Sequence, residues 1–81
     1  MTAKLAGKAR TQALNQMRAL IATAPDEIRS ELRDLNVHRM LEKASSYRPA
    51  GRRDPVAATK YALRTLARRA IALEAEITNI D

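Results

Sequence analysis

Hydrophobic and polar residues alternate with a helical period along most of this chain. In the first segment, polar side chains recur every three or four positions, as at Lys4, Lys8 and Thr11, and the opposite side is apolar. Arg10 interrupts that apolar side. The spacing is that of an amphipathic α-helix and predicts a helix over about residues 2–22.

Proline and polar residues divide the middle of the chain into two shorter elements. Pro25 suits the first turn of a helix but not a helix interior, so a new helix is expected to begin there. Asn36 is a favoured N-cap residue for the next helix, and Pro49 ends it. We therefore predict short helices over about residues 25–35 and 37–47.

The strongest pattern lies in the last third of the chain. Asp54 is a favourable N-cap and Pro55 a favourable first residue for a helix over about residues 55–81. Apolar positions then recur in alternating steps of three and four, which is the repeat of a coiled-coil seam. The seam residues are Val56, Thr59, Leu63, Leu66, Ala70, Leu73, Ile77 and Ile80. The pattern leaves open whether the partner helix belongs to this chain or to a second one.

Together these segments predict an all-α fold, with residues 1–81 forming a single helical coiled-coil segment. Two long helices would pack as an antiparallel hairpin, with two short helices between them in sequence. Much of the 46% hydrophobic content is alanine, and Phe and Trp are absent, so the core is expected to be thin. A thin core favours further packing partners, and we expect self-association.

Basic residues are concentrated in blocks within a net charge of +6. Residues 48–69 hold seven basic residues against one acid, Asp54, and three of the seven lie four positions apart on one helical stripe. Such a stripe can follow the phosphates of DNA or RNA without reading bases. The candidate nucleic-acid backbone contacts are Arg48, Arg52, Arg53, Lys60, Arg64 and Arg68. The alternative is a solubilising outer face of a coiled coil.

The charges of the last helix also run against its dipole, because the N-terminal half is basic and the C-terminal half is acidic. This arrangement indicates either an external partner or a neighbouring helix of opposite direction. The sequence does not separate these two explanations.

Residue patterns for catalysis are missing from the sequence. There is no cysteine, the single histidine, His38, has no second ligand nearby, and no base is placed to activate Ser45 or Ser46. We therefore expect no catalytic residue, metal ion, cofactor or small-molecule substrate. No apolar run approaches the length of a membrane span, which predicts a cytoplasmic protein without a membrane partner.

Three stretches of the chain together resemble one protein family. They are KARTQALNQMRALI at residues 8–21, TAPDEIR at 23–29 with LRDL at 32–35, and DPVAATKYALR at 54–64, continuing to residue 77. The family comprises bacterial insertion-sequence transposases with a RuvC-like Asp-Glu-Asp-Asp nuclease domain and a second domain bearing a catalytic serine. It is known as the IS one-ten family of bridge-RNA-guided recombinases.

The resemblance implies a fragment of a larger transposase, namely the helical coiled-coil region between its two catalytic domains. It also implies DNA transposition and recombination as the parent activity, with DNA, guide RNA and parent transposase subunits as partners. No residue of this chain matches the nuclease acids or the catalytic serine. A second reading is an independent small basic helical regulator that binds DNA or RNA. A third, a small helical enzyme, lacks a supporting group of polar residues.

Overall fold

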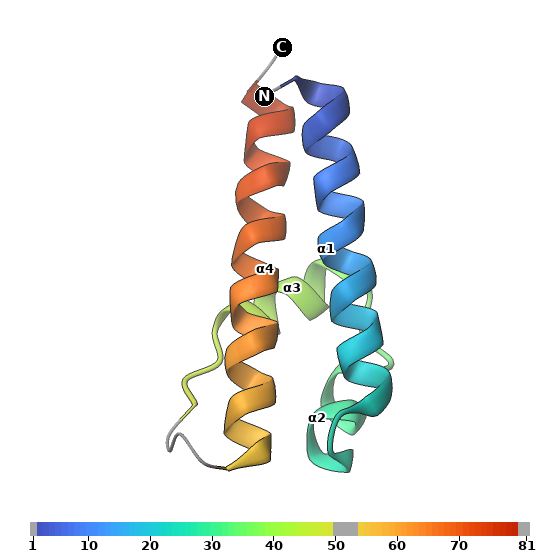
Figure 1. Ribbon diagram of the computed structural model, residues 1–81, viewed down its shortest axis with the longest axis vertical. Helices are drawn as coiled ribbons and strands as arrows, with labels where there is room; N and C mark the ends of the chain where they lie inside the picture. Colours follow the sequence, from blue (N-terminus) through green and yellow to red (C-terminus); the bar gives the residue numbers. More distant parts are fainter. Residues whose placement is uncertain (1, 50–53, 80–81) are drawn as a thin grey trace.

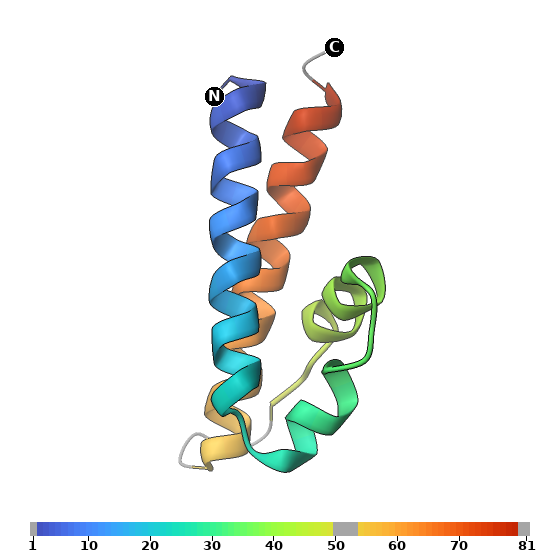
Figure 2. The same ribbon diagram turned by 90° about the vertical axis from the view of Figure 1, so that its right-hand side faces the viewer.

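The computed structural model describes residues 2–49 and 54–79, which form four α-helices and no strand within these ranges. In chain order they are α1 (Ala3–Thr23), α2 (Asp26–Leu32), α3 (Val37–Ser45) and α4 (Pro55–Asn79). Figures 1 and 2 show α1 and α4 side by side in opposite directions, with α2 and α3 packed along part of their length. The predicted all-α fold of two long helices with two short helices between them is confirmed.

Two predicted cap residues determine where α3 and α4 begin. The side-chain oxygen of Asn36 accepts a hydrogen bond from the backbone N–H of Arg39 at 2.9 Å. The carboxylate of Asp54 accepts one from the N–H of Val56, also at 2.9 Å. Each bond satisfies a donor that the first turn of a helix leaves without an intrahelical partner. Local sequence signals were therefore sufficient to place both starts.

The second helix is shorter than predicted at both ends. Pro25 is its N-cap, with an extended ψ of 148°, rather than its first helical residue. At the other end, α2 stops at Leu32, and the N–H of Leu35 donates to the Leu32 carbonyl at 3.2 Å. Asn36 has the extended backbone of an N-cap, so the chain must leave helical geometry before it. The third helix likewise ends at Ser45 rather than at residue 47.

The core lies where α1, α4 and the two short helices meet. Its largest fully buried side chains are Met17, Ile28, Leu32 and Leu63. Alanines fill much of the remaining space, and those with no exposed surface include Ala6, Ala44, Ala67 and Ala70. Such small side chains let helices approach closely but bury little apolar area, so a few large residues contribute most of the hydrophobic stabilisation.

The predicted seam of α4 packs within this chain. Leu63 and Ala70 have no exposed surface, and Leu73 is 6% exposed. Val56 and Leu66 are half-buried against the same core. The seam therefore has a partner in the antiparallel α1 and in α3, and it does not require a second chain.

The buried stripe of α4 does not coincide fully with the predicted seam. Thr59 and Ile77 are only half-buried, and the Thr59 hydroxyl donates to the Pro55 carbonyl at 2.9 Å. Ala67, which lies outside the predicted seam, is fully buried. Because α4 contacts both α1 and α3, its apolar stripe is wider than the two positions per heptad of a coiled coil. Ile80 lies outside the described residues.

A glycine inside α1 offers a simple test of helix stability. A Cβ atom added at Gly7 would meet no heavy atom within 4 Å. Glycine in a helix interior costs about 1 kcal/mol relative to alanine, so Gly7→Ala should raise the free energy of unfolding by about 0.5–1 kcal/mol. Urea denaturation followed by circular dichroism measures this change. Gly7→Val is the matched control and should gain less, since valine loses side-chain freedom in a helix. A lower stability for Gly7→Ala would contradict the prediction.

Candidate nucleic-acid interface

The segment that leaves α3 carries a largely buried tyrosine, Tyr47, which is 8% exposed. Its hydroxyl donates a hydrogen bond to the carboxylate of Glu31 at 2.9 Å. The ammonium group of Lys43 lies 3.9 Å from the same carboxylate oxygen. Burial, together with this carboxylate, raises the pKa of Tyr47 above its ordinary value. Tyr47 thus connects the end of α3 to α2.

The basic stripe of α4 lies against the same segment. The Nζ atom of Lys60 is 5.1 Å from the centroid of the Tyr47 ring, within the range of a cation–π contact. The Nη1 atom of Arg64 donates to the Tyr47 carbonyl at 3.5 Å. The Nε atom of Arg68 donates to the Ser45 carbonyl at 3.3 Å. The three stripe residues therefore meet the chain where α3 ends.

These contacts provide partners within the chain for several of the unusually distributed charges of α4. The last carbonyls of a helix lack intrahelical donors and carry negative partial charge, and Arg68 binds such a carbonyl at Ser45. In the acidic half of α4, Glu74 lies 3.7 Å from the Nε atom of Arg10 in α1. Arg10, which interrupted the apolar side of the first helix, thus reaches the antiparallel neighbour. Neighbouring segments of the chain thus supply partners for Arg64, Arg68 and Glu74, but no carboxylate for the basic stripe among the described residues.

The basic residues retain capacity for an external acceptor. A guanidinium carries five N–H donors, and Arg64 and Arg68 each use one of theirs in the hydrogen bonds above. Arg48 and Arg68 are exposed, and Lys60 and Arg64 are half-buried. Within residues 2–49 and 54–79, no carboxylate lies within ion-pair distance of any of these four cations. We call these four residues, together with Tyr47, the Tyr47 cluster.

The Tyr47 cluster contains four of the six predicted backbone contacts. Lys60, Arg64 and Arg68 are brought together by their contacts with Ser45 and Tyr47, and Arg48 follows Tyr47 directly in sequence. Arg52 and Arg53 lie outside the described residues. Tyr47 itself was not singled out from the sequence. It is one of only two aromatic residues and stands directly before a basic block, which was a usable signal. The other aromatic, Tyr61, has its ring centroid 5.0 Å from the Arg64 guanidinium carbon.

Other residues considered from the sequence take part in ordinary helix contacts. The hydroxyls of Ser45 and Ser46 donate to the carbonyls of Glu42 and Lys43, at 3.0 and 2.8 Å. His38 is exposed in the first turn of α3. The described part of the chain holds no group of three or more His, Cys, Asp or Glu side chains placed to bind a metal ion. None of its helices is both long enough and apolar enough to cross a membrane.

Comparison with known proteins yields no assignment. No protein-family model, curated protein or solved structure matches the chain. The resemblance to insertion-sequence transposases therefore stays a prediction that rests on the three quoted segments.

Proposed function

We propose that this chain is a non-catalytic helical segment of a bacterial insertion-sequence transposase that acts in the cytoplasm and contacts the backbone of DNA or RNA through the Tyr47 cluster. One observation carries the proposal. Three cations of α4 contact the segment where α3 ends, and Arg48 follows Tyr47 in that segment. None of these four has a carboxylate in ion-pair range among the described residues. A cationic surface that lacks its own counter-charges attracts a polyanion.

The spacing of the cluster suits a run of phosphates. Lys60 and Arg68 are eight residues apart on α4, which is about 12 Å along a helix axis. That length corresponds to the rise of about three or four base pairs along duplex DNA. The Tyr47 cluster offers positive charge and hydrogen-bond donors, so the expected contact is with phosphates rather than base edges.

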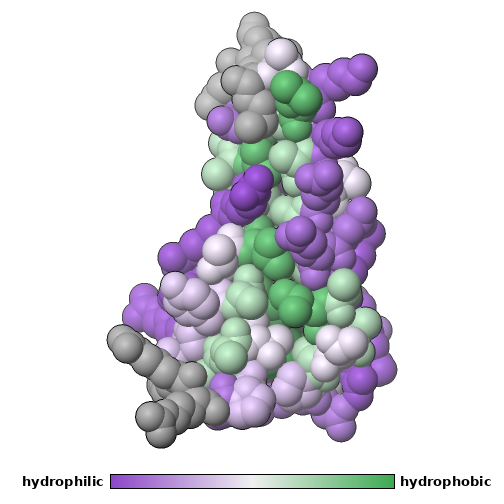
Figure 3. Space-filling model, viewed as in Figure 1, coloured by the Kyte–Doolittle hydropathy of each residue, from purple (hydrophilic) through white to green (hydrophobic). Residues whose placement is uncertain are grey.

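Self-association belongs to the same proposal but would use a surface other than the seam, because α4 already buries much of the seam inside the chain. Figure 3 shows hydrophobic surface along the line where α1 and α4 meet. Large hydrophobic residues that are exposed in the described ranges are Leu5, Tyr61 and Ile71. We propose that such residues contact a second copy or the rest of the parent transposase.

The salt dependence of binding tests the nucleic-acid contact. We expect a labelled DNA duplex and a labelled hairpin RNA to bind at low salt. On duplex DNA, the slope of log affinity against log salt should be about −4 if the four cations each neutralise one phosphate. Arg48→Gln should make that slope shallower by about one unit. The matched control is Lys8→Gln, because Lys8 is an exposed cation of α1 that lies outside the cluster. This variant should leave the slope nearly unchanged.

Arg68 requires two variants, because it also binds the Ser45 carbonyl. Arg68→Gln removes the charge and should make the slope shallower by about one unit. Arg68→Lys keeps the charge and should preserve the slope even if it lowers stability. Failure of the wild-type chain to bind either nucleic acid at low salt would contradict the proposal. A strong preference for one duplex sequence would instead favour the independent DNA- or RNA-binding regulator.

A further inference from the structure

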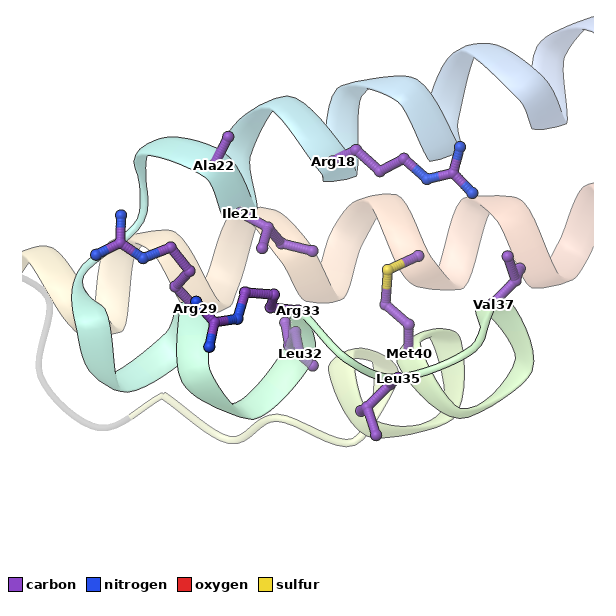
Figure 4. Close-up of a pocket in the computed structure, with 9 residues that line it drawn as sticks. All are labelled: Arg18, Ile21, Ala22, Arg29, Leu32, Arg33, Leu35, Val37 and Met40. Carbon is purple, nitrogen blue, oxygen red and sulfur yellow. The ribbon is translucent and has the colours of Figure 1, made fainter.

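A groove of about 330 Å³ lies between α1, α2 and the beginning of α3 and shares no residue with the Tyr47 cluster. Figure 4 shows its lining residues, which come from the three helices and from the connection between α2 and α3. Ile21, Leu32 and Met40 form its apolar floor, and each is at most 7% exposed. Leu35 and Val37 are half-buried beside them. The groove is therefore apolar along its base.

Its rim carries three arginines, Arg18, Arg29 and Arg33, and none of the described residues that line the groove is acidic. The guanidinium of Arg29 binds Asp26, and Arg33 lies 3.8 Å from Asp34, but the side chains of both aspartates are largely exposed. Exposed pairs of this kind are weak and exchange readily for another carboxylate. Within residues 2–49 and 54–79, no carboxylate lies within ion-pair distance of Arg18.

We propose that this groove binds an acidic peptide segment of a partner protein, which inserts a bulky apolar side chain between the arginines. The floor favours an apolar group, and the rim favours carboxylates on either side of it, because guanidinium groups bind carboxylates with paired hydrogen bonds. The groove is at the lower end of the range for small-ligand pockets, about 300–1,000 Å³, so it suits a side chain or two rather than a long apolar ligand.

The same features favour a peptide over a nucleic acid. Single-stranded nucleic acids bind through basic grooves that also present aromatic side chains for base stacking. None of the lining residues that the structure describes is aromatic, and the base of Ile21, Leu32 and Met40 offers phosphates no partner. The inference does not depend on the proposed nucleic-acid contact, because the two surfaces use different residues.

Fluorescence anisotropy with a labelled helical peptide tests the groove directly. The peptide carries a single leucine between glutamates on one face. Ala22 is exposed and lines the groove, so Ala22→Phe should fill it and weaken peptide binding at least tenfold. Ala19→Phe is the matched control, because Ala19 is exposed on the same helix but does not line the groove, and it should leave affinity unchanged.

The rim is tested by charge removal. The double variant Arg18→Gln with Arg33→Gln should weaken peptide binding about tenfold, as expected for the loss of two exposed ion pairs. Lys8 is an exposed cation that does not line the groove, so Lys8→Gln should leave peptide affinity unchanged. A peptide with serine in place of leucine should bind at least tenfold more weakly than the original. Circular dichroism of each variant verifies that the fold is retained.

Several results would overturn the inference. They are equal binding of the leucine and serine peptides, an unchanged affinity in Ala22→Phe, or no binding by the wild-type chain. If Ala22→Phe instead weakens duplex binding, the occupant is a nucleic acid. If it converts a dimer of the chain into a monomer without any peptide binding, the occupant is a second copy. Either of these last two outcomes also rejects the acidic peptide. The salt slopes of the Arg48 and Arg68 variants test the Tyr47 cluster separately.

Discussion

Replacing Leu63 with aspartate is expected to unfold the chain. Leu63 has no exposed surface and is among the four largest fully buried side chains. An unpaired charge at this position would cost several kcal/mol. A domain of this length has a total stability of about 4–12 kcal/mol, so that cost approaches the whole. Circular dichroism should show loss of most helical signal, and Leu63→Ala should lower the free energy of unfolding by about 2–5 kcal/mol.

Ile71 provides the matched control on the same helix. It is a large apolar residue of α4, but it is 41% exposed, so Ile71→Asp should retain the fold. Leu66 is half-buried against the core, so Leu66→Asp should lose an intermediate amount of helical signal. If Leu63→Asp kept its helicity and only reduced the molecular mass of an oligomer, the seam would pack against a second chain. That result would contradict the arrangement described above.

Most of the fold was predictable because its signals are local. The starts of α3 and α4 depend on cap residues that bond to the backbone two or three positions away. The period of apolar residues likewise fixes which side of α1 and α4 is buried. The end of α2 was not predictable in this way. After Leu32 the helix gives way to a turn in which the N–H of Leu35 donates to the Leu32 carbonyl, and the spacing of apolar residues does not mark that change. Local patterns therefore predicted which helices form better than where each helix ends.

The candidate sites were predictable only where they lie on one helix. The spacing of Lys60, Arg64 and Arg68 shows from the sequence alone that they share a stripe. Their contacts depend on how the end of α3 packs against α4, and sequence spacing holds no information about that contact. The arginine-lined groove combines Arg18 of α1 with Arg29 of α2, and only the packing of these helices brings them together.

Removing the side chain of Tyr47 is expected to have the second-largest effect. Its hydroxyl binds Glu31 of α2, its ring lies beneath Lys60 of α4, and its backbone follows α3. Truncating a buried aromatic residue costs about 3–5 kcal/mol, and Tyr47→Ala should lower the free energy of unfolding by about 3 kcal/mol. Tyr61→Ala is the matched control, because Tyr61 is 57% exposed and should cost much less. Urea denaturation of the two variants gives both values.

The hydroxyl of Tyr47 adds a dependence on pH that Tyr47→Phe isolates. Burial and Glu31 raise the pKa of Tyr47, so the folded chain keeps a proton that the unfolded chain loses above pH of about 10. The stabilisation is complete below that pH and declines above it, by at most about 1.4 kcal/mol per pH unit. Urea denaturation at pH of about 9 and 11 should show this decline in the wild-type chain and in Tyr61→Phe, but a smaller one in Tyr47→Phe. An equal decline in all three proteins would show that the hydroxyl of Tyr47 loses its proton equally readily in the folded and unfolded chain.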